Sequence, residues 1–289
     1  MQDWDHFRLI LALHRAGTVR AAAGLLGVNH ATVSRHLAHI NTKYEQPIFE
    51  RVAGGYKATY LGKQLIDAAK KMEDISFSVT RQDRAAEPEI SGPITLSLPK
   101  PIAQFLLADA LVAFTQQHPK VELTLETSYQ FVNLDRSEAD IVVRGTNYPP
   151  EHLVGRRLFP YALCYYCGVD YLASTPKNAR KWLSFSPRAE AVKWVAHSPY
   201  PSAPMGMQVD DLTFLHNAAI AGHGMIRAAC YMADPEPELK RLPGSAPSPA
   251  ADLWVLTHPD LRDTPKIKAL MRFLAETLTS KQDLIEGRR

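Results

Sequence analysis

Hydrophobic positions between residues 18 and 40 recur with the spacing of two short helices joined by a tight turn. The first helix is rich in alanine and leucine and is expected to end at Gly27. In the second helix, Val33, Leu37 and Ile40 lie at i, i+4 and i+7, so they form one buried stripe. Asn29 precedes this helix and is expected to cap it. The pattern predicts a helix-turn-helix.

The open face of the second helix is small, hydroxylated and basic, and no acidic residue occurs between Arg8 and Lys43. Such a face can enter a DNA major groove without repelling the phosphates. A helical hairpin that only packs within the protein is the alternative. Further on, Gly54-Gly55 predicts a hairpin turn, and hence a wing beside the helices. The expected DNA-binding residues are Arg20, Asn29, His30, Ala31, Thr32, Ser34, Arg35, Arg51 and Lys57. For Arg51 and Lys57, the two residues in the wing, the alternative is a surface charge without a role in DNA binding.

A long helix is predicted from Leu61 onward, because its apolar residues are spaced alternately by four and three. This is the heptad spacing of a coiled-coil seam, which favours dimerisation. The alternative is a helix that packs on its own domain. The predicted seam consists of Leu61, Leu65, Ala68, Met72, Ile75 and Val79.

Beyond a proline- and glycine-containing hinge, the pattern changes to strands alternating with helices, which predicts an α/β fold with a parallel sheet. Strands are expected at 94–98, 121–127 and 139–143, with a helix at 102–117. A second α/β block is expected to begin near Tyr161, with strands at 160–173, 192–198 and 253–256 and a helix at 210–221. The chain is expected to return to the first block near His258, where a last helix is predicted at 265–278.

Ligands of parallel α/β sheets bind beyond the carboxyl ends of the strands. Lys100 and Arg144 both follow predicted strand ends, which favours a small anionic effector, although surface charge is the alternative for each. A crevice that binds no ligand is a further alternative. The expected effector-binding residues are Lys100, Pro101, Thr127, Ser128, Arg144, Thr146, Ser198, Tyr200, His223 and Met225.

Charge is distributed unevenly along the 289 residues. Residues 1–84 hold 12 basic and 8 acidic residues, whereas the remainder holds 21 basic and 22 acidic ones. The positive excess therefore coincides with the predicted helix-turn-helix, as neutralisation of DNA phosphates requires. The N-terminus does not resemble a signal peptide, and no run of about 18 apolar residues occurs. A cytoplasmic protein without a membrane partner is expected.

Two other classes of protein are alternatives for such a chain: an enzyme and an exported solute-binding protein. The sequence lacks GxSxG, GxxxxGK[ST] and HExxH motifs, and no export signal is present. Cys164 and Cys167 are three residues apart on a predicted strand, so their thiols are expected to point to opposite faces. We therefore expect no catalytic residues, no metal and no cofactor, with a solute-binding protein or an enzyme built on the α/β part as the alternative.

Nearly the whole chain resembles the LysR-type transcriptional regulators. The resemblance is carried by Ala21-Ala22-Ala23, Val33-Ser34-Arg35, Ile48-Phe49-Glu50-Arg51, Ala139-Asp140-Ile141 with Arg144, and Gly222-His223-Gly224. It implies a winged helix-turn-helix, a linker helix and an effector domain of two α/β subdomains like a periplasmic binding protein. The partners that it implies are double-stranded promoter DNA, a small-molecule effector and further copies of the chain in a homodimer or homotetramer; RNA polymerase is an additional candidate. At Asn29-His30 the chain departs from the family's usual Ser-Gln.

The predicted domain boundaries follow from these patterns. Ile285-Glu286-Gly287-Arg288 matches a protease-cleavage linker, so the last six residues are expected to lie outside the fold as a cloning remnant. The predicted segments are the winged helix-turn-helix (1–60), the linker helix (61–85), the hinge (86–93), effector subdomain I (94–160 and 259–283), subdomain II (161–258) and the remnant (284–289).

Overall fold

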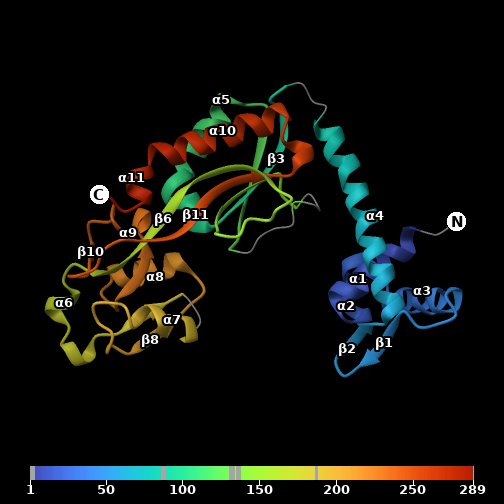
Figure 1. Cartoon of the computed structure of the whole chain (residues 1–289), viewed down its shortest axis with the longest axis horizontal. Coiled ribbons are helices and arrows are strands. Elements are labelled where there is room, and N and C mark those ends of the chain that lie inside the picture. The colour runs from blue at the N-terminus through green and yellow to red at the C-terminus, as the bar shows by residue number, and fades with distance from the viewer. Residues whose placement is uncertain (1–3, 86–88, 130–133, 135–137, 186–187, 289) are drawn as a thin grey trace. The chain divides into compact units, whose positions relative to one another are not determined.

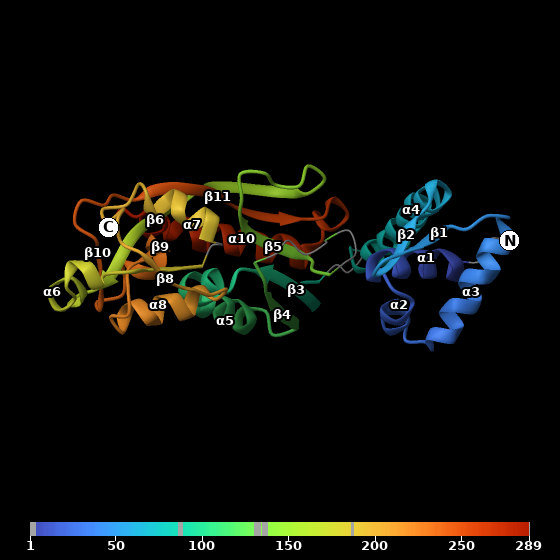
Figure 2. The ribbon, with the colours of Figure 1, turned by 90° about the horizontal axis from the view of Figure 1, so that it is seen from below.

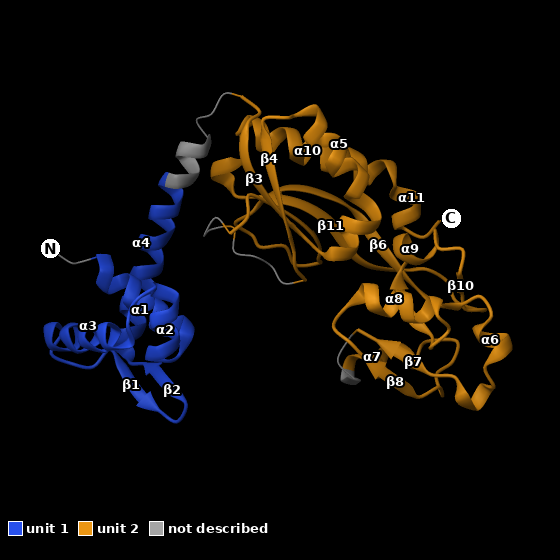
Figure 3. Cartoon of the chain, turned by 180° about the vertical axis from the view of Figure 1, so that it is seen from behind, with its two compact units in different colours: residues 1–80 blue, residues 81–289 orange. Residues whose placement is uncertain are grey.

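The computed structural model describes residues 4–85, 89–129, 134, 138–185 and 188–288. The chain divides into two compact units, residues 1–80 and 81–289 (Figure 3). We call them the N-terminal unit and the effector unit. The elements that begin in the N-terminal unit are α1 (Trp4–Ala16), α2 (Val19–Leu26), α3 (His30–Lys43), β1 (Phe49–Val52), β2 (Gly55–Ala58) and α4 (Tyr60–Ala85).

The first helix ends at Gly27 and the second is capped by Asn29, as the sequence predicts, and Thr18 adds a cap at the start of the first. The Thr18 side chain accepts a hydrogen bond from the Ala21 amide and caps α2, which ends at Gly27 in the left-handed conformation (φ 65°). The Asn29 side chain accepts from the Ala31 amide at 2.9 Å and caps α3. The stripe Val33, Leu37 and Ile40 is buried against α1, α2 and the start of α4. Local sequence therefore sets where α2 starts and ends and where α3 begins.

The wing is fastened to the rest of the unit through two glycines. The Tyr56 amide donates to the Gly17 carbonyl at 2.8 Å, and a side chain at Gly55 would clash with that same carbonyl. Thr59 caps α4 by accepting from the Gly62 amide at 3.0 Å, and its hydroxyl also donates to the backbone before β1. A Cβ at Gly62 would lie 2.0 Å from the Ile48 carbonyl oxygen, so only glycine fits there. The wing and α4 thus start from one rigid junction.

The linker helix α4 only partly fits the predicted dimer seam. Leu65 is buried in the core of its own unit, and Leu61, Ala68 and Met72 pack partly against that core. Leu65 therefore serves the core of its own unit, which was the alternative for this helix, and its place in a seam stays a prediction. Arg15 of α1 holds α4 through a two-pronged ion pair with Glu73, with nitrogen–oxygen distances of 2.9 and 2.5 Å. Further along, Ile75 and Val79 are 64% and 63% exposed, and for them the seam stays a prediction.

The effector unit is built on a mixed sheet in the order β10-β6-β11-β5-β3-β4, with β9 also paired to β6. β3 pairs in parallel with β4 and β5, as predicted, whereas β6 and β11 run antiparallel to their neighbours. β7 and β8 form a separate sheet of two parallel strands. The strands are β3 (Gly92–Leu98), β4 (Val121–Thr127), β5 (Ile141–Gly145), β6 (Val154–Gly168), β7 (Trp182–Ser184), β8 (Met205–Gln208), β9 (Ile226–Ala229), β10 (Leu239–Arg241) and β11 (Ser248–Thr257).

Helices cover this sheet. α5 and α10 pack against each other and share the main core cluster with the strands (Figure 1); the Phe114 and Phe273 rings are 5.2 Å apart. The helices of the unit are η1 (Ile102–Leu107), α5 (Ala108–Gln117), α6 (Tyr171–Ser174), η3 (Lys177–Ala179), α7 (Arg188–Val195), α8 (Leu212–Ile220), α9 (Cys230–Ala233), η4 (Pro259–Leu261), α10 (Pro265–Ser280) and α11 (Gln282–Ile285).

The long strands β6 and β11 run through both halves of the effector unit (Figures 1 and 2). The predicted subdomain boundary at residues 160/161 therefore falls inside β6. β11 shifts register against β6 at Pro249/Ala251 and again at Asp252/Trp254. The two halves thus share one continuous sheet, with its irregular pairing close to the predicted boundary. The predicted hinge also extends too far, because β3 begins at Gly92; residues 86–88 lie outside the described residues.

Three predicted elements differ from the structure. The strand expected at 160–173 ends with β6 at Gly168, and residues 171–173 belong to the short helix α6. The expected helix at 102–117 starts as the π-helix η1, whose wider turn places Ile102, Ala103, Leu106 and Leu107 in the core. The expected strand at 192–198 is wrong, because this region contains the end of α7. Ala191 and Val195 are buried at i and i+4, which is a helical spacing that the short apolar run obscured.

The last residues are part of the fold, so the prediction that 284–289 lie outside it is wrong for the described residues 284–288. Ile285 is fully buried, and Arg241 donates to the Gly287 carbonyl at 2.9 Å. Gly287 lies so close to Cys230 that a Cβ there would approach its sulfur to 2.7 Å. The match to a cleavage linker misled because a four-residue pattern carries no information about packing.

All three cysteines are free and buried. Cys164 and Cys167 belong to different core clusters, which confirms that their side chains leave β6 on opposite faces. A search of the described helices finds none with the length and hydropathy of a membrane span.

Candidate nucleic-acid interface and effector cavity

The predicted DNA-binding residues gather around one open hollow on the N-terminal unit. This hollow is lined by the start of α2, the start of α3 and the whole wing turn. Arg20, His30, Ser34 and Arg51, which are far apart in sequence, all line it. The Arg51 guanidinium lies 5.9 Å from the centre of the Tyr56 ring, so the wing itself holds this cation in place. Positive charge and hydrogen-bond donors thus face one open surface.

The remaining predicted residues of this surface differ in availability. Arg35 and Ala31 are exposed on α3 and Thr32 is half-buried, so all three lie on or beside the open face. Lys57 is exposed on β2, directly opposite Glu50 in the hairpin register. The Asn29 side chain already bonds the Ala31 amide, so its first role is structural. The candidate interface therefore consists of an α3 face flanked by a basic wing.

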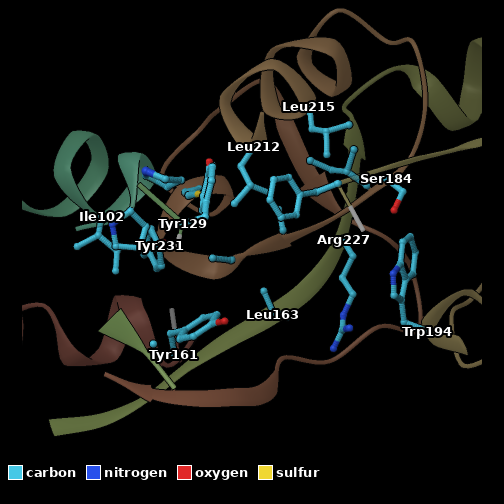
Figure 4. Close-up of a pocket in the computed structure, with 18 of the residues that line it drawn as sticks. Ile102, Tyr129, Tyr161, Leu163, Ser184, Trp194, Leu212, Leu215, Arg227 and Tyr231 are labelled. Carbon is cyan, nitrogen blue, oxygen red and sulfur yellow. The ribbon is translucent and has the colours of Figure 1, made fainter. Parts of the chain in front are cut away.

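A second site lies within the effector unit, where a cavity of about 340 Å³ separates β5 and the start of η1 from β7 and α8. Figure 4 shows Ile102, Tyr129 and Tyr231 at one end, and Ser184, Arg227 and Trp194 at the other. Leu212 and Leu215 of α8 lie on one side, and Tyr161 and Leu163 of β6 on the opposite side. The lining is mostly apolar and aromatic, with two arginines, as in a site for a small organic molecule.

The two cavity arginines are held differently. Arg144 is 2% exposed, and its terminal nitrogens donate to the Val143 carbonyl and to the Ser97 hydroxyl, both at 2.9 Å. Burial lowers the pKa of Arg144 to about 10, which still leaves it protonated at neutral pH. Arg227 is half-buried in β9, and no hydrogen bond or ion pair joins its side chain to the described residues. Of these two arginines, Arg227 is therefore the one whose guanidinium the described residues leave available to a ligand.

Family models match both parts of the chain. Residues 4–63 match the bacterial regulatory helix-turn-helix protein of the lysR family, and residues 88–279 match the LysR substrate binding domain. The chain belongs to the LysR family. It is a LysR-type transcriptional regulator with a helix-turn-helix DNA-binding domain and a substrate-binding effector domain.

Relatives of the chain include the Mau operon transcriptional activator of Paracoccus denitrificans, 30% identical over 142 residues, a match that spans about half of each protein. The regulator DsdC of Escherichia coli is 26% identical over 282 residues, covering 88% of this chain and 87% of DsdC. Solved LysR-type structures share the fold. CrgA of Neisseria meningitidis superposes with a TM-score of 0.58 at 19% identity over 96% of this chain and 99% of CrgA. AphB of Vibrio cholerae gives 0.57 at 16% identity over 95% and 99%. These relatives are named as regulators.

Within the LysR effector domain, the structure brings only part of the predicted effector set into the cavity. Pro101 and Arg144 line it, and Ser198 lines an adjoining hollow that shares Trp194 and Arg227. The others lie elsewhere. Thr127, at the end of β4, and His223 are exposed, whereas Met225 is fully buried in the core. The other three are engaged in hydrogen bonds within the protein: the Ser128 amide donates to the Leu98 carbonyl, and the Thr146 hydroxyl accepts from the Tyr148 amide. The Tyr200 carbonyl accepts from the Trp182 indole. The expected convergence of all ten residues is not found.

The cavity residues that sequence reasoning missed are mainly Tyr129, Tyr161, Trp194 and Arg227. One signal was available: Arg227 interrupts the apolar run from Met225 to Ala229. A charged residue in such a run is costly to bury unless it has a partner, which points to a functional role. The tyrosines and the tryptophan gave no such signal, because aromatic residues in strands and helices usually fill the core.

A set of contacts, which we call the α8 clamp, joins the two sides of the cavity. The Lys100 ammonium lies 3.1 Å from an Asp211 carboxylate oxygen, and the Thr213 hydroxyl donates to the Gln104 side chain at 3.1 Å. Asp211 also caps α8 by accepting from the Thr213 and Phe214 amides. Those amides and Lys100 hold the pKa of Asp211 below its usual value. Lys100, predicted as a ligand contact, is thus one half of a bridge across the cavity.

His216 is a buried histidine of the effector unit whose pKa is shifted. It is 3% exposed on α8, beside the Phe105 ring, and 4.0 Å from a Glu236 oxygen. Its Nδ1 has no hydrogen-bond partner among the described residues. Burial lowers the pKa of His216, and Glu236 opposes this in part. A lowered folded-state pKa means that the unfolded chain takes up the proton first, so acidification below the usual histidine pKa favours unfolding.

We therefore expect His216→Gln to flatten the loss of stability of the effector unit between pH 7.5 and pH 5. Differential scanning calorimetry of the full chain at several pH values measures this. His14, whose pKa burial also lowers, lies in the N-terminal unit and provides the control variant His14→Gln, which should keep the effector-unit profile. An unchanged pH profile in His216→Gln would show that His216 does not contribute to the acid sensitivity.

Proposed function

We propose that this LysR-type regulator binds promoter DNA as a homodimer or homotetramer and changes its DNA contacts when an effector occupies the cavity. The observation that carries the proposal is the convergence of Arg20, His30, Ser34 and Arg51 around one hollow beside α3. With the N-terminal end of α3 in the major groove, the wing would lie along the adjacent phosphate backbone.

The composition of this surface supports DNA as the partner. Phosphate contacts need cations, and the wing and α2 supply Arg20, Arg51 and Lys57. Base contacts need side chains that reach into the groove, and the exposed Ser34 and Arg35 are of the right kind. A regulator, rather than an enzyme, is also favoured by the names of the relatives. We place its action in the cytoplasm, with RNA polymerase as the candidate partner at the promoter.

Assembly is supported by exposed apolar side chains in both units. Ile75 and Val79 lie one helical turn apart on α4, which suits the pairing of two linker helices. Apolar side chains are also exposed on α5, β4 and α8, namely Val112 (57%), Leu125 (43%) and Phe214 (51%). A dimer would hold two copies of α3 against two half-sites, which raises affinity without new contacts in each copy.

Selection of duplexes from a random-sequence pool with the purified full chain tests the proposal. We expect enrichment of an inverted repeat whose half-sites are separated by about 10 base pairs or a multiple, because a two-fold protein reads DNA from one face. An enriched pool without internal symmetry would contradict the dimeric reading. No enrichment over the starting pool would contradict sequence-specific binding altogether.

A further inference from the structure

We propose that the effector cavity takes a small aryl-substituted carboxylic acid as its monoanion, with the carboxylate on Arg227 and the aromatic ring toward Tyr129 and Tyr231. This inference rests on the proposed function, in which the cavity is the effector site. It goes further because it names the charge, the polarity and the orientation of the ligand.

The charge of the ligand follows from the end of the cavity where Arg227 lies. A half-buried guanidinium with no acceptor in the described structure favours an incoming oxyanion, and its planar fork matches a carboxylate. No aspartate or glutamate lines the cavity among the described residues. Asp211, which lies near Tyr129, is already paired with Lys100, so an ammonium group would find no free counter-charge in the lining. This disfavours amines and free amino acids.

A single negative charge is favoured because the other cavity arginine is already engaged. Both terminal nitrogens of Arg144 are used for protein oxygens, on Val143 and Ser97. A second carboxylate would have to compete with these buried bonds.

At the Arg227 end, by contrast, the Trp194 indole nitrogen faces Arg227 (Figure 4) and makes no hydrogen bond with the described residues. The Tyr165 hydroxyl holds Trp194 by donating to its carbonyl at 2.9 Å. Arg227 and Trp194 thus form one seat for one carboxylate.

The body of the ligand follows from the rest of the lining. Between the two ends, Leu163, Leu212 and Leu215 offer only apolar surface (Figure 4), which disfavours sugars and other polyols. At the far end the Tyr129 ring packs on Phe185 at 5.0 Å. Aromatic side chains in this arrangement present faces and edges that a third ring can stack against. The cavity volume of about 340 Å³ lies at the lower end of the range of roughly 300–1,000 Å³ that is usual for small-molecule sites, which favours a compact ligand such as a phenylalkanoate.

Isothermal titration calorimetry of the full chain with phenylacetate and 3-phenylpropanoate tests the proposal. We expect saturable binding of at least one of them, and binding at least tenfold weaker for 2-phenylethanol, which keeps the ring and removes the charge. Succinate, which has two charges and no ring, should not compete. Arg227→Gln should weaken binding at least tenfold, and Arg227→Lys should lie between. Arg156→Gln changes an exposed arginine of β6 outside the cavity lining and should bind like the parent.

Several outcomes would overturn the proposal. Undiminished phenylacetate binding by a folded Arg227→Gln, or by Arg227→Lys if the first variant does not fold, would remove the carboxylate seat. Equal affinity for 2-phenylethanol would remove the requirement for charge. If neither acid binds while the chain still selects its DNA repeat, the ligand class is wrong and the proposed regulator stands. Failure of the DNA selection would instead overturn the proposed function.

Discussion

Arg35→Ala is expected to weaken binding to the selected DNA repeat by about 10- to 100-fold, with little change in binding to unrelated duplex. Arg35 is exposed on α3. It directly follows Ser34, which lines the hollow together with His30. An arginine in this position can donate two hydrogen bonds to a guanine edge, which is worth about 1–3 kcal/mol of discrimination. Loss of the side chain removes the base contact and leaves most phosphate contacts intact.

Gel-shift titration with the selected repeat and with a scrambled duplex measures both effects. Lys57→Ala, in the wing, tests a phosphate contact instead of a base contact. Its loss should weaken binding to both duplexes alike. Arg8→Ala is the matched control, since Arg8 is exposed on α1 and pairs with Asp5 outside the hollow. Parent-like discrimination by Arg35→Ala would remove Arg35 from base recognition.

Ile75→Glu is expected to convert the protein to monomers and to lower its affinity for the selected repeat by about 10²- to 10⁴-fold. Ile75 is 64% exposed in the single chain, so the substitution leaves the core of the N-terminal unit intact. In a paired helix seam the new carboxylate would lose its water, and burying an unpaired charge costs several kcal/mol. Without pairing, each monomer binds one half-site and the gain from linked binding disappears.

Sedimentation velocity at low micromolar concentration reports the assembly state, and the same samples serve for the gel shift. Ile75→Leu keeps the apolar surface and should remain assembled with full affinity. Met72 is a poorer choice for this test, because it packs partly against its own unit and a charge there would disturb the fold. Assembly of Ile75→Glu identical to the parent would show that α4 does not form the dimer contact.

The helix-turn-helix was predictable because its determinants are local. Thr18, Gly27 and Asn29 each mark a helix end within one turn of their own position, and the stripe of Val33, Leu37 and Ile40 needs only helical spacing. The wing was predictable for the same reason, since Gly54 and Gly55 lie in the turn that they permit. Surfaces built from consecutive elements therefore follow closely from the sequence pattern.

The effector cavity was predictable only in part because it depends on how distant segments meet. The rule that ligands lie beyond parallel strands led to Pro101 and Arg144, which do line the cavity. It could not find Tyr161 and Leu163, because they lie on β6, an antiparallel strand that runs through both halves of the unit. Lys100 follows the end of β3, as predicted, but its ammonium group pairs with Asp211. This partner is 111 positions away in the sequence, so no local pattern reveals it.

The burial of all three cysteines has a practical consequence for spectroscopy. Burial raises the pKa of the Cys167 thiol, and it raises that of Cys230 to about 11, so little reactive thiolate forms at neutral pH. A cysteine introduced at an exposed position away from the predicted seam, such as Tyr148, which is 90% exposed, should therefore take a maleimide dye or spin label selectively, with the native cysteines left in place. Distances between labels in an assembled protein could then report effector-induced rearrangement directly.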